Sequence, residues 1–383
     1  MRIFYASIDT ANPALDSRIW RRNLYEGLVE MGCDVVEFDF PLRETFRNLD
    51  PSDEKQAEFI SSKRPKLGNE ILRQIQYAHG ISKINMFFSY FYDACVEPEI
   101  IDAIKNMGIL TVNWYCNSTH QFELVRNIAP HYDWCLVPEK ARLESYREIG
   151  AKPIYCQMAA NPRFYHPTGE RQDLSVSFVG QAYGERPELA RFLVQNGIDI
   201  RVFGPQWEYF LDPSERGRLG WLRRMMRRLP FLDGNGDAAE QPEHGEHAPH
   251  WLPAGIFGGI PDDSEMVSVF NRSKINLGFG ACDVAQKSPR VLQMRLRDFE
   301  IPMCGGFYLT EYFEELSEFY RIGREIECYR DKGEMLDKIR YYLSHDTERE
   351  RIRRAGHERC LREHTWEKRF AEAFKTMGVM EAK

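Results

Sequence analysis

The stretch that decides the fold is LSVSFVGQAYGERPELARFLVQNGIDIRVFG, residues 174–204. Its opening residues, LSVSFV, and its closing residues, IDIRVF, are rich in β-branched and aromatic side chains, which predicts two strands. Between them, RPELARFLVQNG carries apolar residues at helical spacing, which predicts a helix. A strand, a helix and a second strand in this order predict a parallel pair of strands joined by a right-handed crossover.

The same alternation of apolar strand-like and helix-like segments fills most of the chain. The clearest strand-like segments are MRIFYASI (1–8), GILTVNWYC (108–116), KINLGFG (274–280) and GGFYLTE (305–311). The pattern pauses near residue 167 and then restarts, which predicts an α/β fold of two doubly wound Rossmann-like domains, residues 1–167 and 168–365. Doubly wound domains bind ligands at the carboxyl ends of their strands, so we expect the site in the cleft between the domains.

Composition and charge narrow the class of protein. The 383 residues are 43% hydrophobic and 28% charged, as in soluble globular proteins, and a net charge of -7 argues against a nucleic-acid partner. We find no apolar run of about 18 residues and no signal peptide at the first residues. The nine cysteines are scattered without a C-x-x-C pair, which is typical of reduced thiols in a cytoplasm. We therefore expect a cytoplasmic protein.

Residues 207–253 interrupt the alternation, and we interpret them as an insertion in the second domain. RGRLGWLRRMMRRLPF (216–231) combines arginines with Leu and Met at helical spacing. A basic amphipathic helix can lie on an anionic membrane surface, which would place the protein peripherally at the inner membrane face. Leu and Met at this spacing also pack on their own protein or on a protein partner, and these alternatives stay open.

The turn after the strand at 174–179 is a candidate phosphate site. Gly180 lets the backbone approach a ligand, and Pro187 suits the first turn of the following helix, whose free N–H groups favour a phosphate. Arg186 would add positive charge. Gly180 and Gly184 are too few for a dinucleotide-binding fingerprint, so an ordinary strand–helix turn stays open as the alternative.

A second candidate site lies in RDFEIPMCGGFYLTE, which begins at Arg297. Glu300 could accept hydrogen bonds from two ribose hydroxyls, and Arg295 or Arg297 could bind a diphosphate bidentately. The two arginines share one side if the segment is extended and diverge if it is helical. Gly305 and Gly306 would let the main chain pack closely on a ligand or a neighbour. The alternative is a surface arginine–glutamate pair, worth under about 1 kcal/mol.

The stretch QMRLRDFEIPMCGGFYLTEYFEEL, which begins at Gln293, closely resembles a signature of the CgeB-like (spore-maturation-type) glycosyltransferases. These belong to the group-1 glycosyltransferases of GT-B fold. FVGQAYGERPEL, KINLGFG and HTWEKRF resemble the same family in the same order, and HYDWCLVPEKARLESYREIGAKPIYCQMAANPRFYHP does so more loosely. The resemblance implies two Rossmann-like domains facing across a cleft. It also implies that the last helix, within residues 366–383, returns to the first domain.

The resemblance further implies roles for single residues. Glu300 matches the glutamate that holds the donor ribose, Arg297 matches an arginine near the diphosphate, and Gly180 matches a glycine turn that faces the phosphates or the acceptor. The other predicted nucleotide-sugar contacts are Arg186, Gln293, Arg295, Gly305 and Gly306. Leu292 replaces a second glutamate that retaining members carry, so the stereochemistry stays open. The resemblance implies transfer without a metal or other cofactor, and the chain has no D-x-D motif.

The catalytic base for the acceptor is expected in the first domain. Asp9, Asp93 and His120 each follow a predicted strand and are the candidates, although each residue type is also common in turns. We predict a glycosyltransferase that moves a sugar from a nucleotide sugar to a hydroxyl of a glycan, an envelope component or a protein-linked acceptor. A nucleotide-sugar epimerase of the same fold, and a non-catalytic scaffold that binds a partner through the basic insertion, remain alternatives.

Overall fold

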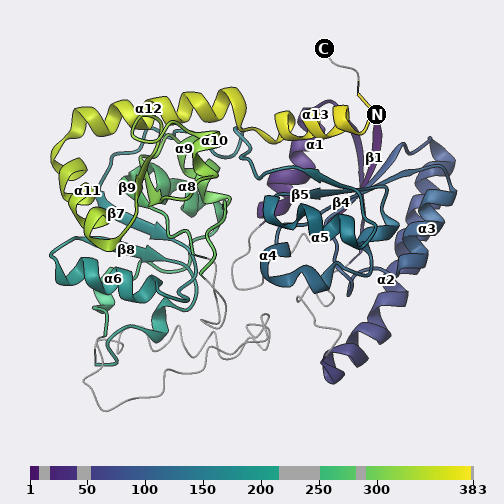
Figure 1. Ribbon diagram of the computed structural model, residues 1–383, viewed down its shortest axis with the longest axis horizontal. Coiled ribbons are helices and arrows are strands. Elements are labelled where there is room, and N and C mark those ends of the chain that lie inside the picture. The colour runs from purple at the N-terminus through teal and green to yellow at the C-terminus, as the bar shows by residue number, and fades with distance from the viewer. Residues whose placement is uncertain (8–17, 41–52, 215–250, 282–289, 381–383) are drawn as a thin grey trace.

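Two parallel sheets form the protein, each in its own α/β domain (Figure 1). The computed structural model describes residues 1–7, 18–40, 53–214, 251–281 and 290–380. Over these residues the first sheet has six strands in the order β2-β1-β3-β4-β5-β6, and the second has five in the order β11-β10-β9-β7-β8. The predicted α/β class with two doubly wound domains is confirmed.

The strands follow the apolar segments of the sequence closely. Those of the first sheet are β1 Arg2–Ala6, β2 Asp34–Glu37, β3 Met86–Ser89, β4 Leu110–Trp114, β5 Trp134–Val137 and β6 Pro153–Tyr155. Those of the second are β7 Leu174–Val179, β8 Ile200–Phe203, β9 Ser273–Leu277, β10 Tyr308–Glu311 and β11 Glu327–Tyr329. The central strand β3 is buried along its whole length, as expected when helices cover both faces of a parallel sheet.

The helices of the first domain include one that the alternation of segments did not predict. The helices are α1 Glu26–Glu30, preceded by a π-helical turn, α2 Glu54–Ile81, α3 Pro98–Asn106, α4 Ser118–Gln121 and α5 Leu143–Glu148. The unpredicted helix is α2, which spans 28 residues and begins where the Asp53 side chain accepts a hydrogen bond from the Gln56 amide (2.9 Å). It buries a narrow stripe at Leu67, Ile71 and Ile75, spaced four residues apart, within an otherwise polar segment.

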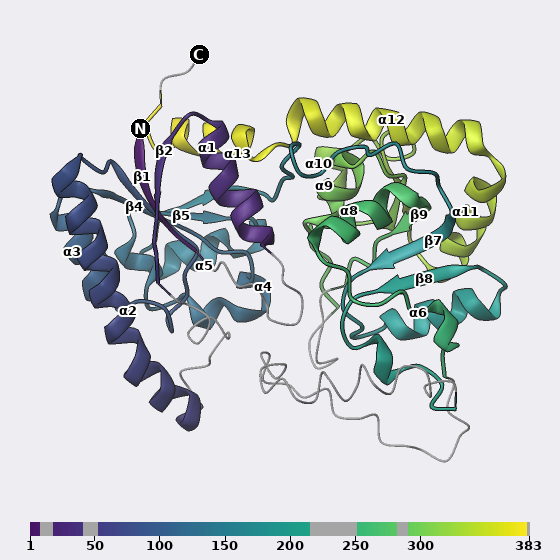
Figure 2. The same ribbon diagram turned by 180° about the vertical axis from the view of Figure 1, so that it is seen from behind.

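The helices of the second domain pack on both faces of its sheet (Figure 2). They are α6 Arg186–Gln195, α8 Asp263–Arg272, α9 Arg297–Met303, α10 Leu316–Phe319, α11 Lys332–Ser344 and α12 Asp346–Glu363. A capping box fixes the start of α8, because Asp262 accepts from the Glu265 amide (2.8 Å) and Glu265 accepts from the Asp262 amide (3.0 Å). Helix α9 begins at Arg297, so the segment is helical from this residue onward, whereas Arg295 precedes the helix.

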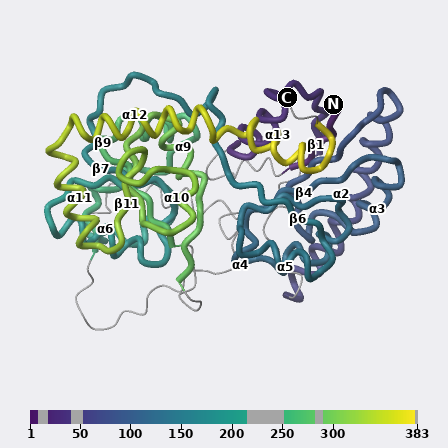
Figure 3. The backbone as a smooth tube through the Cα atoms, turned by 45° about the horizontal axis from the view of Figure 1, so that its top comes forward, coloured from purple at the N-terminus to yellow at the C-terminus, as the bar shows by residue number. Residues whose placement is uncertain are grey.

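The last helix, α13 Trp366–Thr376, crosses from the second domain to the first (Figure 3). The Trp366 ring lies 5.5 Å from the Trp114 ring, and its Nε1 donates a hydrogen bond to Asn23 Oδ1 (2.8 Å). A Cβ added to Gly27 in α1 would lie 2.8 Å from the Trp366 Cβ, so this close approach requires a glycine. Phe370 continues the contact, with its ring 5.5 Å from that of Phe88. The core of the first domain therefore includes residues from the end of the chain.

Residues near both ends of the predicted insertion, 207–253, are hydrogen-bonded to each other in the second domain. Leu252 donates to the Phe210 carbonyl (2.9 Å), and Asp212 donates to the Leu252 carbonyl (2.9 Å). Trp207 is fully buried, so the first residues of the predicted insertion belong to the domain core. The basic stretch 216–231 lies outside the described residues. Among the helices that are described, we find none with the length and apolar character needed to span a bilayer.

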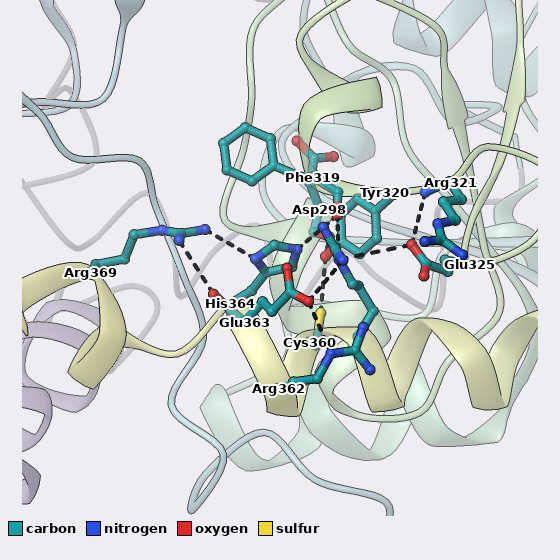
Figure 4. Close-up of polar contacts among 11 residues, drawn as sticks. Asp298, Phe319, Tyr320, Arg321, Glu325, Cys360, Arg362, Glu363, His364 and Arg369 are labelled. Atoms are coloured by element: carbon teal, nitrogen blue, oxygen red, sulfur yellow. Dashed lines mark hydrogen bonds and ion pairs between the residues drawn. The ribbon is translucent and has the colours of Figure 1, made fainter. Parts of the chain in front are cut away.

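His364 lies at the junction of α12 and α13, where the chain passes between the domains (Figure 4). Its Nε2 lies 2.9 Å from the Phe319 carbonyl oxygen, and its Nδ1 lies 3.2 Å from Nη2 of Arg369. Because a carbonyl only accepts and a guanidinium only donates, the ring is neutral and carries its proton on Nε2. Burial, together with the Arg369 charge, lowers the pKa of His364 to about 4.

We expect acid to weaken this junction. The unfolded His364 takes up a proton near pH 6.5, whereas the folded residue resists protonation until about pH 4. Its contribution to stability is therefore complete above pH 6.5 and is lost as the pH falls toward 4. The loss between about pH 7 and about pH 5 should be about 2 kcal/mol. Urea denaturation of the wild type and of His364→Gln measures it, and equal losses in the two proteins would contradict the assignment.

Candidate functional site

The two domains meet along the edges where their strands end. The Tyr155 hydroxyl, at the end of β6, donates to Glu315 Oε1 (2.6 Å), and Gln157 Nε2 donates to the same oxygen (3.0 Å). Glu315 lies just after β10 in the second domain. On the other side, Arg22 Nε contacts Asp263 Oδ2 at 3.0 Å. The carboxyl ends of β6 and β10 therefore approach each other, which is where doubly wound domains bind ligands.

Arg295 ties together two strand ends of the second domain. Its Nη2 donates to the Tyr183 hydroxyl, in the turn after β7 (3.0 Å), and to the Ala281 carbonyl, after β9 (3.2 Å). Arg186 stays within the turn after β7, where its Nη1 donates to the Gln181 carbonyl (2.9 Å) and its guanidinium lies 3.8 Å from the Tyr183 ring centre. Two of the arginines predicted to contact the donor thus lie at this edge and also organise its loops.

Gly180 occupies the tightest part of the same edge. Its amide donates to the Phe203 carbonyl (2.8 Å), and its carbonyl accepts from Trp207 Nε1 (2.8 Å). Gly204 has a φ of 125°, and a Cβ there would lie 2.5 Å from the Gly180 oxygen. Gln293, two residues before Arg295, has a buried side-chain oxygen that accepts no hydrogen bond from the described residues. Both main-chain polar groups of Gly180 are therefore paired within the protein, whereas the Gln293 side-chain oxygen is left for a donor.

The Arg297–Glu300 pair is buried, which contradicts the alternative of a surface pair. Arg297 Nη1 pairs with Glu300 Oε2, one turn along α9, and Glu300 is 0% exposed. The Arg297 guanidinium lies 5.5 Å from the Phe270 ring centre, and burial together with the Glu300 charge raises the pKa of Tyr165 from the segment between the domains. The pair is thus enclosed by α8, α9 and this segment, and a ribose would reach Glu300 only after Arg297 moved.

Gly305 and Gly306 lie at the amino ends of the strands of the second sheet, whereas Gly180 lies at their carboxyl ends. They precede β10, whereas Gly180 follows β7, and the two strands run parallel. Gly305 has a φ of 68°, and its carbonyl accepts from Arg353 Nη1 (2.6 Å). A Cβ on Gly306 would lie 2.8 Å from Asn276 Nδ2. The structure gives these two glycines a packing role away from the interdomain edge.

The three candidates for the acceptor-side base lie in different settings. Asp9 is outside the described residues, and His120 is an exposed residue of α4. Asp93 is buried and pairs with Arg64 Nη1 at 3.4 Å. Burial raises the pKa of Asp93 although the Arg64 charge opposes this. Asp93 therefore already has a cationic partner in Arg64.

Glu139 is a buried acid at the interdomain edge that the sequence analysis did not select. It follows β5, is 8% exposed, and its Oε1 accepts from the Ser118 amide (3.1 Å). Its Oε2 is buried and meets no hydrogen-bond donor among the residues that the structure describes. Burial raises the pKa of Glu139 to about 8, and the negative charge of Glu315 adds to the shift. The available signal was the position of this acid just after the apolar run WCLV (134–137).

Arg290 and Glu311 form a second group that the sequence analysis did not select. Arg290 Nη2 contacts Glu311, at the end of β10 (2.6 Å), and Glu185, in the turn after β7 (2.5 Å). Glu311 is 5% exposed, and burial raises its pKa, whereas the Arg290 side chain is 46% exposed. A partly solvated cation therefore stands at the same strand ends as Arg295, where an anionic ligand could recruit it.

Comparison with known proteins indicates the class of protein to which this fold belongs. Residues 186–375 match the model of the family described as "Glycosyl transferase-like", so the match begins at α6 of the second domain and extends through α13. The fold of the whole chain is GT-B, and together with this match it supports a glycosyltransferase. No curated protein matches the sequence.

Three solved structures illustrate the likeness. Sucrose-phosphate synthase from Thermosynechococcus elongatus has a TM-score of 0.59 at 12% identity, over 99% of this chain and 99% of that one. HepE from Anabaena, in complex with UDP and glucose, has a TM-score of 0.52 at 11% identity, over 99% and 100%. AviGT4, a glycosyltransferase involved in avilamycin A biosynthesis, has a TM-score of 0.52 at 13% identity, over 98% of each chain. At these identities the likeness shows the fold.

Proposed function

We propose that the protein is a glycosyltransferase that moves a sugar from a nucleoside diphosphate donor to an acceptor hydroxyl. The observation that carries this proposal is the edge of the second sheet, where Gly180, Arg290 and Arg295 surround the strand ends of a glycosyl transferase-like domain. The donor would bind this edge, and the acceptor would bind the facing edge of the first domain. Because HepE holds UDP and glucose, a uridine diphosphate sugar is the first donor to test.

We also propose that the protein is of the CgeB-like type and that transfer needs no metal. Guanidinium groups would offset the negative charge that develops on the leaving diphosphate, as fixed cations do in many transferases. Arg290 and Arg295, at the strand ends of the second domain, would supply these charges. Over the described residues there is no group of three or more His, Cys, Asp or Glu side chains that could hold a metal ion.

We expect one nucleoside diphosphate to raise the melting temperature of the wild type, because a ligand that binds the native state stabilises it. The panel comprises uridine, guanosine, thymidine, cytidine and adenosine diphosphates, with and without EDTA. Calorimetry should then show binding to Arg290→Gln weakened about 10-fold or more, since hydrogen bonds to charged groups contribute about 1.5–3 kcal/mol. Arg351→Gln, at an exposed position on α12, is the control and should bind as the wild type does.

The outcomes of this experiment separate the parts of the proposal. If no nucleoside diphosphate binds, the donor assignment is wrong. If binding is found only without EDTA, the proposal of metal independence fails. Incubation with the donor alone then distinguishes a transferase, which hydrolyses it slowly, from an epimerase, which converts it into an isomeric donor.

A further inference from the structure

We propose that Glu139 is the general base that accepts the proton of the acceptor hydroxyl, an inference that rests on the function proposed above. Glu139 follows the carboxyl end of β5 and precedes Lys140, which pairs with Glu318 of the second domain. The Ser118 amide fixes its Oε1, while its Oε2 has no donor among the described residues. A carboxylate held by one oxygen and unpartnered at the other has the arrangement that a base requires.

Charges from both domains affect the pKa of the Cys116 thiol. Burial raises the pKa of this thiol, the Glu139 charge raises it further, and the Arg295 charge lowers it. A carboxylate from the first domain and a guanidinium from the second therefore lie within electrostatic reach of the same thiol. Lys140, the neighbour of Glu139, pairs with Glu318 of the second domain, so Glu139 lies beside the contact between the domains.

The groups around Glu139 favour its neutral form at neutral pH. The titratable and charged groups that act on it or feel its charge are Arg142, Glu315, Tyr115, Cys116 and Tyr146. Arg142 is the cation among them, and burial outweighs its effect, so the pKa of Glu139 rises to about 8. A base whose pKa lies near the working pH combines a useful ionised fraction with a strong pull on the proton.

The proposed step needs no further reactant. A lone pair of the acceptor oxygen forms a bond to the anomeric carbon of the sugar, while the bond from that carbon to the diphosphate oxygen breaks. The electron pair of the broken bond leaves with the nucleoside diphosphate, near Arg290 and Arg295. The acceptor proton passes to Glu139 Oε2, and the resulting carboxylic acid later releases it to solvent.

The contacts between the domains beside Glu139 include an exposed ion pair. Lys140, the next residue, pairs with Glu318, and the two side chains are 40% and 53% exposed. Exposed ion pairs of this kind stabilise a protein little. Glu315 adds hydrogen bonds from Tyr155 and Gln157. An acceptor that separates Lys140 from Glu318, and Glu315 from its hydrogen-bond donors, would reach Glu139 from between the domains.

The test measures turnover and donor binding separately in the full-length protein. The variants are Glu139→Gln, Glu139→Asp and the control Glu144→Gln, whose side chain is 71% exposed on α5. The probes are UDP-glucose and the sugars of the other nucleoside diphosphates, with water as the acceptor, so the natural acceptor need not be known. The readouts are the release of nucleoside diphosphate between about pH 6 and about pH 9 and its affinity by calorimetry.

We expect Glu139→Gln to hydrolyse the donor at least about 100-fold more slowly while binding nucleoside diphosphate normally. Glu139→Asp should recover part of the rate, and Glu144→Gln should match the wild type. The wild-type rate should rise with pH and level off above about 8, because the base acts in its ionised form, and this rise should be absent from Glu139→Gln.

Other results would contradict either the assignment of Glu139 as the base or the proposed function. Wild-type turnover or an unchanged pH profile in Glu139→Gln overturns the assignment of the base and leaves the glycosyltransferase intact. Loss of nucleotide binding together with turnover in both Glu139 variants shows a structural role and also overturns it. If the wild type itself neither binds nor cleaves any donor, the proposed function falls, and the base assignment falls with it.

Discussion

Replacing Arg297 with methionine should lower the free energy of unfolding by about 3–5 kcal/mol, because it leaves the Glu300 carboxylate buried without its cation. Glu300→Gln should cost less, since the Arg297 side chain is 27% exposed and water can solvate part of its charge. Urea denaturation at neutral pH measures both variants. The order of the two losses follows from the burial of each partner, and the reverse order would contradict this account of the pair.

A double variant provides the control for this pair. The double variant Arg297→Met/Glu300→Leu should recover much of the lost stability, as apolar side chains often replace a buried ion pair at little cost. A double variant as unstable as Arg297→Met alone would mean that packing, not charge, determines the loss.

The same variants test the ribose contact predicted for Glu300. Glu300→Gln keeps the size of the side chain and removes its charge, so calorimetry on the folded variant separates binding from stability. A ribose contact predicts clearly weaker binding of nucleoside diphosphate, because hydrogen bonds to a charged acceptor are strong. Unchanged affinity would leave Glu300 with a purely structural role beneath the site.

Truncating Trp366 to alanine should cost about 3–5 kcal/mol, the range for a buried large aromatic side chain. The indole is 1% exposed, packs against Trp114 and Phe370, and donates to Asn23, which would lose its hydrogen bond. Leu361→Ala, at a 45% exposed position on α12, is the control and should change stability little. Urea denaturation measures both variants, and a small loss in Trp366→Ala would show that α13 docks loosely on the first domain.

The sequence predicted the class of fold because that class depends on local patterns. Alternating apolar strands and helices specify parallel α/β units wherever they occur, and segments such as 174–204 contain a complete unit. Helix α2 was missed because its buried stripe is narrow and most of its residues are polar. A pattern that buries a small part of a long helix gives a weak periodic signal.

The candidate site was less predictable because it depends on contacts between distant residues. The sequence shows that Gly305 and Gly306 are glycines, but the edge of the sheet at which they lie follows from the direction of β10. It shows that Arg297 and Glu300 are one helical turn apart, but their burial depends on Tyr165 and Phe270. The pKa of Glu139 is raised by burial and by the negative charge of Glu315, which is distant in the sequence.

The return of α13 to the first domain has a consequence for how the protein is made. Ribosomes deliver the amino terminus first, and domains at that end usually fold while the remainder is still being synthesised. Here Trp366 and Phe370 complete the core of the first domain, so that core cannot be complete until the second domain has been synthesised. We expect the second domain to finish folding before it, and nascent chains that stop short of α13 to depend on chaperones.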